Sequence, residues 1–187
     1  MGSLTEEQKS ILIGCLLGDG TLRRKRNTLL EINHSDKQRD YVFWIYSKFR
    51  GLVSTPPKIR VSGLNRKSYR FTTRSLSFLN EFYESFYSKS HQKTVPRDLR
   101  LNPLSLAIWF MDDGSKSRNT IYLNTQQFDL SDQGYLLYLL KSNFDVEATL
   151  NKDKHYFRIR IKTCFMKKFR DLVSPYIIKS MEYKLPL

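Results

Sequence analysis

The stretches LIGCLLGDG (residues 12–20) and LAIWFMDDG (residues 106–114) decide the fold, because each is an apolar run that ends in an aspartate followed by glycine. Their aspartates, Asp19 and Asp113, lie 94 residues apart (113 − 19), and these are the only two Asp-Gly pairs in the chain. Runs of this composition predict two helices, each of which ends at its Asp-Gly pair.

The chemistry of these helix ends points to a metal. An aspartate at the C-terminal end of a helix faces the negative end of the helix dipole, which is an unfavourable place for an anion unless a cation lies beside it. An Asp-Gly pair is also a common helix stop, because glycine tolerates the left-handed conformation that follows a last turn. A single copy would favour the helix stop. Two copies in one chain favour a paired acidic site for a divalent metal.

The composition is that of a folded, basic protein. Of 187 residues, 40% are hydrophobic and 13% aromatic, and 32 Lys and Arg against 18 Asp and Glu give a net charge of +14. This excess predicts a polyanionic partner, nucleic acid in preference to a membrane. No apolar run has the length of a membrane span, and Glu6 and Glu7 occupy the place of a basic signal leader, so we expect an intracellular protein without a signal peptide. Two cysteines exclude a disulfide framework.

The order of elements occurs twice along the chain. The tripeptide Arg-Asn-Thr follows each acidic motif, at 26–28 and 118–120, and each half closes on a lysine shortly before a proline, Lys93 before Pro96 and Lys184 before Pro186. Strand-like and helix-like stretches correspond at 29–33 and 121–125, 39–49 and 132–144, 69–72 and 157–160, and 76–87 and 164–173. We therefore predict an α+β protein in which residues 1–187 form one compact body of two pseudo-repeats, 1–97 and 98–187, each with the order αββαββα.

The starts of the two motif helices are also marked. Thr5 and Gln8 have the spacing of a capping box, with Leu4 placed for a hydrophobic staple. Asn102 followed by Pro103 reads as an N-cap and a proline at the first helical position.

Several strands place positive charge on one face. In the segment 157–162, basic and apolar residues alternate, and 58–61 and 69–74 repeat the pattern, so that a basic face would lie opposite an apolar one. One such strand is usually an ordinary solvated face, but three of them in a chain of this charge favour a surface for nucleic acid. With the basic loops that follow the acidic motifs, the predicted DNA contacts are Arg23, Arg24, Lys25, Arg26, Lys58, Arg60, Arg70, Arg74, Lys116, Arg118, Arg158, Arg160 and Lys162.

The two nine-residue runs resemble the LAGLIDADG motif, and the chain is identified as a member of the LAGLIDADG homing endonucleases of the single-chain, two-motif type. The similarity extends to the segment Leu-Asn-Thr-Gln at 123–126 and to the closing Tyr-Lys-Leu-Pro at 183–186. The resemblance implies that the motif helices pack together at the centre. It also implies that two curved antiparallel sheets form a saddle on the major groove of a long, asymmetric double-stranded DNA target.

The resemblance assigns roles at the site. Asp19 and Asp113 would bind and act through Mg²⁺, with the backbone carbonyls of Gly18 and Asp112 assisting, and Lys93 and Lys184 would be catalytic. Mn²⁺ would substitute, and Ca²⁺ would bind without supporting cleavage. Glu31 and Asn124 would position water.

Two departures from the family pattern remain. Gly14 and Gly18 suit close helix packing, but the aligned residues of the second helix are Ile108 and Asp112, so the crossing is expected to be asymmetric. Asp112 adds a second acid beside Asp113, as a cap, a supporting group or the true ligand, and the register favours Asp113 as the ligand. The histidines, His34, His91 and His155, are too scattered in sequence to predict a catalytic cluster.

Two other functions use the same scaffold. One is an RNA-splicing maturase that binds intron RNA, and the other is a DNA-binding regulator without catalysis that uses the acids only as helix stops. Both aspartates and both lysines are present, which favours the endonuclease, expected to be a monomer. The family analogy suggests a mitochondrion or chloroplast as the compartment.

Overall fold

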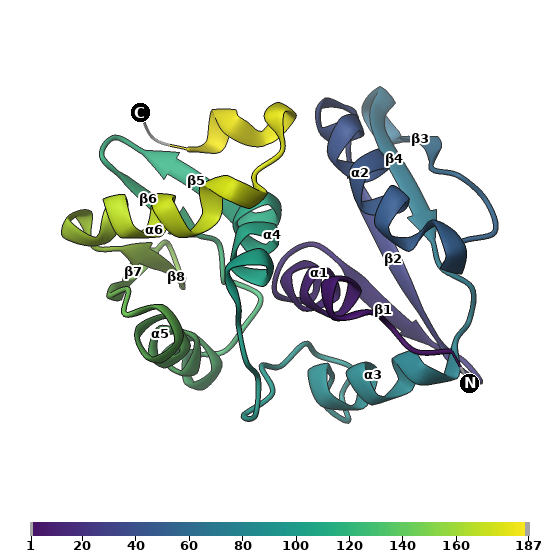
Figure 1. Cartoon of the computed structure of the whole chain (residues 1–187), viewed down its shortest axis with the longest axis horizontal. Coiled ribbons are helices and arrows are strands. Elements are labelled where there is room, and N and C mark those ends of the chain that lie inside the picture. Colours follow the sequence, from purple (N-terminus) through teal and green to yellow (C-terminus); the bar gives the residue numbers. More distant parts are fainter. Residues whose placement is uncertain (1, 186–187) are drawn as a thin grey trace.

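The computed structural model describes residues 2–185, apart from the side chain of Leu64, so that Pro186 of the predicted Lys-Leu-Pro ending lies outside the described residues. Within that range the chain folds as two αββαββα halves that lie side by side (Figure 1), which confirms the predicted α+β class. The helices and strands of the first half are α1 (Glu6–Leu17), β1 (Thr21–Arg24), β2 (Thr28–Ser35), α2 (Arg39–Phe49), β3 (Lys58–Ser62), β4 (Arg66–Thr72) and α3 (Asn80–Phe86). Those of the second half are α4 (Pro103–Asp113), β5 (Gly114–Ser117), β6 (Thr120–Leu123), α5 (Leu130–Phe144), β7 (Ala148–Asp153), β8 (Tyr156–Ile161) and α6 (Met166–Val173).

Each half contributes one four-stranded antiparallel sheet. The strand orders are β1-β2-β4-β3 and β5-β6-β8-β7, so the two sheets have the same topology. The apolar residues of the inner strands, such as Leu30, Ile32, Ile159 and Ile161, are fully buried against the helices. Their neighbours in sequence, such as Glu31, Arg158 and Arg160, point to the other face of each sheet, which is largely polar.

The motif helices begin where their sequences predict. Thr5 and Gln8 form a reciprocal capping box at the start of α1. Asn102 caps α4 in the same way with Ser105, and Pro103 takes the first helical position. Each cap satisfies backbone N–H groups that have no partner inside the helix, so both starts are fixed by local chemistry.

The two motif helices pack closely at the centre of the molecule (Figure 1). A Cβ atom on Gly14 would lie 2.5 Å from Cβ of Ile108, and one on Gly18 would lie 2.3 Å from Cβ of Asp112. The glycines of α1 therefore accept the larger side chains of α4. Ile108 and Asp112, at which α4 departs from the family pattern, thus face Gly14 and Gly18 of α1, which have no side chains.

The glycines after the aspartates serve another purpose than the one expected of a helix stop. None of the described glycines has a positive φ, so Gly20 and Gly114 do not supply a left-handed turn. A Cβ on Gly20 would lie 2.8 Å from Cβ of Cys15, and one on Gly114 would lie 2.2 Å from a ring carbon of Phe110. Glycine is required because the first strand of each sheet leaves its helix with no room for a side chain.

One strand departs from its predicted pattern. The sequence predicted an apolar face on β3 opposite its basic face, and this apolar face is exposed: all five residues of the strand are exposed, with Ile59 at 48% and Val61 at 59%. The strand lies at the edge of its sheet, and none of its residues is covered by α2. Side chains alternate between the two faces of β3 as predicted, but its apolar side chains, Ile59 and Val61, are not buried.

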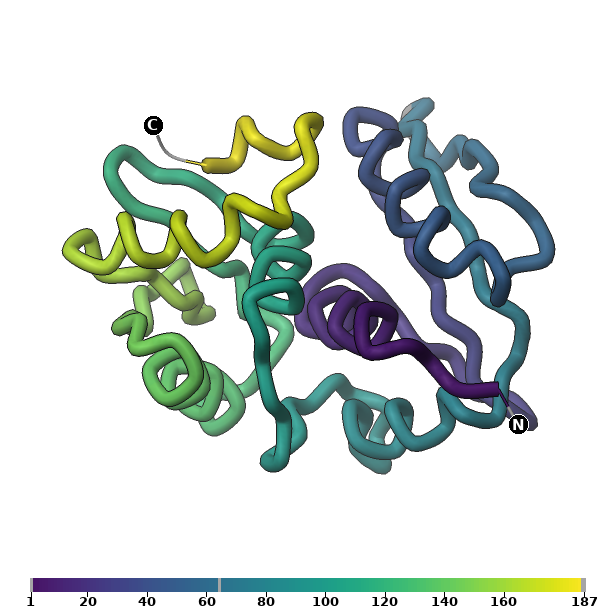
Figure 2. The backbone as a smooth tube through the Cα atoms, viewed as in Figure 1, coloured from purple at the N-terminus to yellow at the C-terminus, as the bar shows by residue number. Residues whose placement is uncertain are grey.

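The halves are joined along one side of the molecule by residues 87–102, which Figure 2 shows running from α3 to α4. This connection is anchored to the second half, where the N–H of Val95 donates to Asp132 over 3.1 Å. The amide of Asn102 donates to the hydroxyl of Ser10 in α1 over 2.7 Å. The division at residues 97 and 98 remains a prediction.

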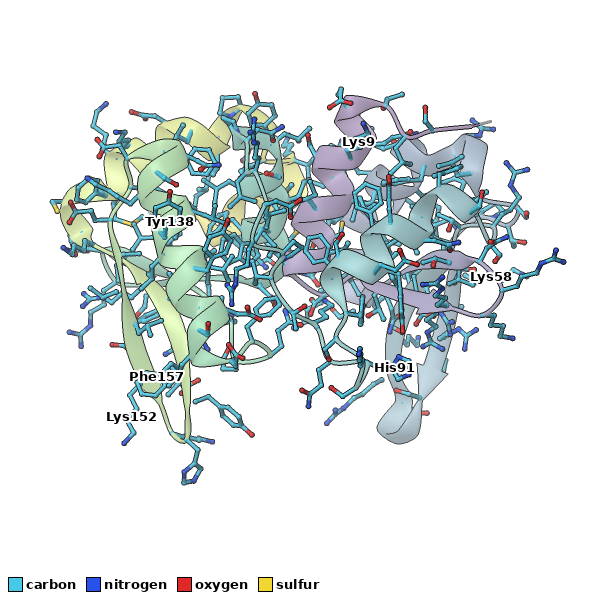
Figure 3. The ribbon with its side chains drawn as sticks, turned by 90° about the horizontal axis from the view of Figure 1, so that it is seen from below. Lys9, Lys58, His91, Tyr138, Lys152 and Phe157 are labelled. Carbon is cyan, nitrogen blue, oxygen red and sulfur yellow. The ribbon has the colours of Figure 1, made fainter. Side chains whose placement is uncertain are left out.

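The sheets extend to the same side of the molecule. Figure 3 shows the β7–β8 hairpin, marked by Lys152 and Phe157, projecting to the same side as the β3–β4 hairpin on the other flank, whereas Lys9 lies on the opposite side. None of the helices in the described part of the chain is long and apolar enough to cross a membrane.

Candidate active site at the ends of the motif helices

Asp19 and Asp113 lie where the two central helices end and the two sheets begin. Asp113 is the last residue of α4, and Asp19 follows the end of α1 by two residues. The N–H of Asp19 donates to the carboxylate of Asp112 over 3.2 Å, and this bond ties the end of α1 to the end of α4. Two acids that are distant in sequence thus share one site.

A lysine from each half reaches the same site. Nζ of Lys93 donates to the carbonyl of Gly18 over 2.7 Å, and Nζ of Lys184, at the end of the short 3-10 helix Lys179–Lys184, donates to the carbonyl of Asp112 over 2.9 Å and to that of Met111. Burial lowers the pKa of both lysines, and the surrounding carboxylates only partly offset the effect. The predicted carbonyl ligands thus each accept a lysine hydrogen bond, and the carbonyl of Gly18 also has Nε2 of Gln127 within 3.3 Å.

Asp112 plays a different part from Asp113. Its carboxyl group is fully buried and accepts a hydrogen bond of 2.6 Å from the hydroxyl of Tyr41, a residue of α2. Its other oxygen accepts from the N–H of Asp19. Both oxygens are occupied by contacts within the protein, so Asp112 supports the site from beneath. This geometry favours Asp113 as the ligand, in line with the register.

His34 belongs to this network, which the sequence interpretation missed. Its ring is buried on β2, with Nδ1 3.5 Å from Asp19 and Nε2 3.6 Å from Asp112. Burial alone would lower the pKa of His34, but Asp112 and Asp19 outweigh burial and raise it. The histidines are scattered in sequence, yet the short β1–β2 hairpin, with Thr21 paired to Glu31, returns His34 to the helix end.

Gln127 is a second residue that the sequence did not single out. Its Nε2 donates to the carbonyl of Leu17 over 3.0 Å, and it lies 3.3 Å from the carbonyl of Gly18 and 3.4 Å from a carboxylate oxygen of Asp113. A residue of the second half therefore contacts the end of the first motif helix. Its place directly after the segment 123–126 is the one signal that would have found it.

The electrostatics of the site are those of crowded carboxylates. Burial, together with the charges of Asp19 and Asp112, raises the pKa of Asp113 to about 8. Burial also raises the pKa of Asp112 to about 6. Partial burial would raise the pKa of Asp19 as well, but His34, Lys184 and Lys93 outweigh that effect and lower it. Added positive charge would relieve the repulsion among these acids.

These residues fit a hard divalent cation. Asp19 and Asp113 offer carboxylate oxygens, and Gly18 and Asp112 offer carbonyl oxygens. No group of three or more His, Cys, Asp or Glu side chains within residues 2–185 has the arrangement of a metal cage. Mg²⁺ suits such a site, because it is commonly held by one or two carboxylates and keeps positions for water and substrate phosphates.

Most of the predicted DNA contacts lie on the polar face of the sheets or in their turns. Four of them lie on the face opposite the buried residues of their strands, namely Arg23, Arg70, Arg158 and Arg160. On the neighbouring strand β3, Lys58 pairs with Arg70 and Arg60 pairs with Ser68, so that both lysine and arginine share this face. Lys25, Arg26 and Arg118 are exposed in the turns that join the first two strands of each sheet. Their positions on the polar faces and in the turns support their predicted role.

Two predicted DNA contacts lie on the helix side of their sheets, and two others form contacts within the protein. Arg24 forms an ion pair of 2.8 Å with Glu84 of α3, on the helix side of the sheet. Lys116 pairs with Ile121, whose side chain is buried, so its register also places it on the helix side. Two others are committed to contacts within the protein, Arg74 to the carbonyl of Gly51 and Lys162 to Glu147. Alternation predicted only which residues share a face: Arg24 and Lys116 lie in the opposite register, and Arg74 and Lys162 follow the last residues of their strands.

The two residues predicted to position water also differ in their surroundings. Asn124 lies at the site, where its side-chain amide donates to the carbonyl of Asp113 over 2.7 Å. Glu31 is buried between Arg23, at 3.0 Å, and Arg70, and each of its oxygens bonds to one arginine. The geometry supports a place for Asn124 beside Asp113 and gives Glu31 a different set of partners.

The chain is similar to known proteins over nearly its whole length. The model of the LAGLIDADG DNA endonuclease family matches residues 9–169. The chain is 31% identical, over 98% of its length, to the probable intron-encoded endonuclease 1 of Wickerhamomyces canadensis and covers 85% of that protein. It is also 31% identical, over 99% of its length, to the cytochrome b mRNA maturase bI2 of Saccharomyces cerevisiae, but it spans only 48% of that protein, about half.

Among solved structures, the chain is similar to the homing endonuclease I-WcaI, bound to its DNA recognition sequence. The TM-score is 0.91 and the identity 29%, over 100% of this chain and 89% of that one. The arrangement of the two halves is thus found in a protein whose structure was solved with its DNA recognition sequence bound.

Proposed function

Because the chain belongs to the LAGLIDADG DNA endonuclease family, we propose that it cleaves double-stranded DNA at a long, asymmetric target, with a divalent metal as cofactor. The observation that carries this proposal is the convergence of Asp19 and Asp113, one from each half, at the joined ends of α1 and α4. A lysine from each half meets them there. The two acidic helix ends, one from each half, would serve the two strands of a duplex.

The residues of the chain prepare this site for phosphodiester hydrolysis. Hydrolysis builds negative charge on the non-bridging and leaving oxygens, and the ammonium groups of Lys93 and Lys184, which bond to the carbonyls of Gly18 and Asp112, would polarise a phosphate bound beside them. Asn124 and Gln127 hold the backbone carbonyls at the two helix ends, which fixes the positions of the acids. His34 and Asp112 support Asp19 from within the protein.

Asp19 and Asp113, with the carbonyls of Gly18 and Asp112, would hold the cofactor. A divalent cation at this place supplies charge that stabilises the reacting oxygens and lowers the pKa of a bound water. Mg²⁺ is the proposed ion, with Mn²⁺ as a substitute and Ca²⁺ as an ion that supports binding alone. Hard oxygen donors support this choice.

Neutralising either acid tests the proposal. In Asp19→Asn or Asp113→Asn, we expect cleavage under Mg²⁺ to be abolished, while DNA binding stays within about tenfold of wild type because phosphate contacts dominate affinity. Cleavage is measured by sequencing the ends of a randomised duplex library incubated with Mg²⁺, with a parallel reaction in Ca²⁺ for binding. Either variant cutting at the wild-type rate would contradict the assignment.

A maturase is the second candidate, because one relative is named a cytochrome b mRNA maturase. In that case the basic face would bind intron RNA, and the aspartates would be dispensable. Competition between the recovered DNA target and intron RNA separates the two functions. Binding of RNA in preference to DNA, without cuts under any metal, would favour the maturase.

Two further properties are part of the proposal. Each half supplies its own motif helix and its own sheet, so one chain is expected to act as a monomer on an asymmetric site. The relatives named after introns suggest an organelle, a mitochondrion or chloroplast, as the compartment.

A further inference from the structure

We propose that Arg70 and Arg158 each read a guanine, one in each half of the DNA target, and that Glu31 and Tyr122 are the residues that position them. The proposal rests on the proposed DNA-cleaving function and adds to it two base pairs of the target. It depends on a correspondence between the sheets and on two different contacts at corresponding places.

The register of the strands establishes the correspondence. Thr21 and Ser115 each follow their motif aspartate by two residues, and they pair with Glu31 and Tyr122 respectively. Glu31 and Tyr122 therefore occupy equivalent positions on β2 and β6.

The same reasoning extends to the next strand of each sheet. Glu31 pairs with Thr72, and Tyr122 pairs with Arg160. The residues two positions earlier on β4 and β8 are Arg70 and Arg158. The two arginines are thus equivalent, at the same separation along the strands from the catalytic aspartates.

The equivalent arginines are held in different ways. Arg70 forms an ion pair with one oxygen of Glu31, and Arg23 bonds to the other oxygen over 3.0 Å. The guanidinium of Arg158 instead stacks on the ring of Tyr122, 4.0 Å from its centroid. Each contact restrains the guanidinium beside a fixed partner before any DNA is bound.

A restrained guanidinium at the positions of Arg70 and Arg158 favours contact with a base over contact with a phosphate. Strands β2, β4, β6 and β8 are the inner strands of their sheets, so the two arginines lie towards the middle of each sheet rather than on its edge strands. A phosphate accepts hydrogen bonds from many directions, whereas the O6 and N7 atoms of guanine require a fork in one plane. The side chain of Arg70 remains 22% exposed, which leaves its guanidinium open to a partner.

The difference between the two contacts has a consequence for binding. The carboxylate of Glu31 removes one positive charge from the face and repels phosphates, whereas the ring of Tyr122 leaves the charge of Arg158 unchanged. Glu31 therefore restrains non-specific binding in the first half, and no equivalent restraint exists at Tyr122.

The test begins with the target recovered from the randomised duplex library described above. We expect one guanine in each half-site, equidistant from the centre of the cut. Duplexes with all four base pairs at each of these two positions are then compared for affinity in Ca²⁺. In Arg70→Ala, discrimination among the base pairs is lost at one position only, by roughly tenfold to a hundredfold, and in Arg158→Ala at the other.

The positioning residues are tested by their conservative variants. Glu31→Gln is expected to weaken discrimination at the Arg70 position and to raise affinity for unrelated duplex DNA. Tyr122→Leu is expected to weaken discrimination at the Arg158 position without raising that affinity. Arg24→Ala is the matched control, because Arg24 lies in the same hairpin as Arg23 but faces α3, and its discrimination should equal that of wild type.

The outcomes separate this inference from the proposed function. Failure to obtain any defined cut or bound target would overturn the endonuclease and this inference together. A defined target without the paired guanines would overturn the inference alone. So would an Arg70→Ala variant that loses affinity equally for all four base pairs, since that result identifies a phosphate contact.

Discussion

At the scale of single residues, the site is built from groups whose charges oppose one another. Asp19, Asp112 and Asp113 repel each other, and burial adds to the cost of their ionised forms. Lys93 and Lys184 offset part of that repulsion but are themselves buried. This cluster therefore lowers the stability of the folded chain, and a bound cation would reduce the repulsion among its carboxylates.

This arrangement predicts how stability depends on pH in the absence of metal. The pKa of Asp113 is raised from 3.8 to about 8 and that of Asp112 to about 6, so the folded chain holds protons that the unfolded chain has released. The free energy of unfolding then falls as pH rises through these values. The raised pKa of His34 acts in the same direction. Asp145 and Glu147, whose pKa values are lowered, affect stability only at more acidic pH.

We therefore expect the Tm in a chelator to be higher at about pH 5.5 than at about pH 8.5, and addition of Mg²⁺ at the higher pH to restore it. Thermal unfolding followed by circular dichroism measures both effects. Asp113→Asn, which cannot ionise, should lose much of the dependence on pH and metal. A Tm that rises with pH over this range in the chelator would contradict the explanation.

At the scale of helices and strands, the contact between α1 and α4 depends on the glycines of one helix. In Gly14→Ala, the new Cβ would lie 2.5 Å from Ile108 and 2.6 Å from the carbonyl of Ser105, so that one helix must shift. We expect a loss of about 1–3 kcal/mol in the free energy of unfolding, as is usual for overpacking. Cleavage should also fall, because the ends of both helices carry the acids.

Gly134→Ala is the matched control for this substitution. Gly134 lies within α5, and a Cβ added there would meet no atom within 4 Å. Alanine is the better helix former, so this variant should gain up to about 1 kcal/mol. Chemical denaturation measures both variants. Equal stability of Gly14→Ala and wild type would show that the helices do not need the glycine.

The same scale shows what could be predicted from sequence. The starts of the motif helices were predictable, because a capping box is written within four residues. The exposure of β3 was not, because it depends on where α2 ends relative to the sheet edge. His34 was missed because its distance from Asp19 is set by the pairing of β1 with β2 and by α4 beside them. The pairing register of two strands can be inferred from the short turn between them, but contacts between the two halves cannot be inferred from the sequence.

At the scale of the whole molecule, the positive charge predicts how DNA binding responds to salt. The net charge is +14, and basic side chains share the polar face of both sheets. If six to ten of them contact phosphates, affinity should fall by about 10³ or more between 50 and 200 mM salt. Fluorescence anisotropy with the recovered target gives the slope. Arg24→Ala should leave that slope unchanged, and an affinity insensitive to salt would exclude a phosphate-based interface.

The two pseudo-repeats are expected to unfold as one unit, because neither can bury its motif helix alone. A single cluster of buried apolar side chains runs through both halves, and α1 and α4 supply residues at its centre. The bonds from Asn102 to Ser10 and from Val95 to Asp132 add polar ties across the same boundary.

Calorimetry should therefore show one transition, and fragments 1–97 and 98–187 should each lack a cooperative transition when prepared separately. Ile59→Ala, on the exposed strand β3, should change the free energy of unfolding by less than about 0.5 kcal/mol. Two separate transitions, or a fragment that unfolds cooperatively, would show that the halves are independent domains, and the close packing of α1 on α4 would then be an interface rather than a core.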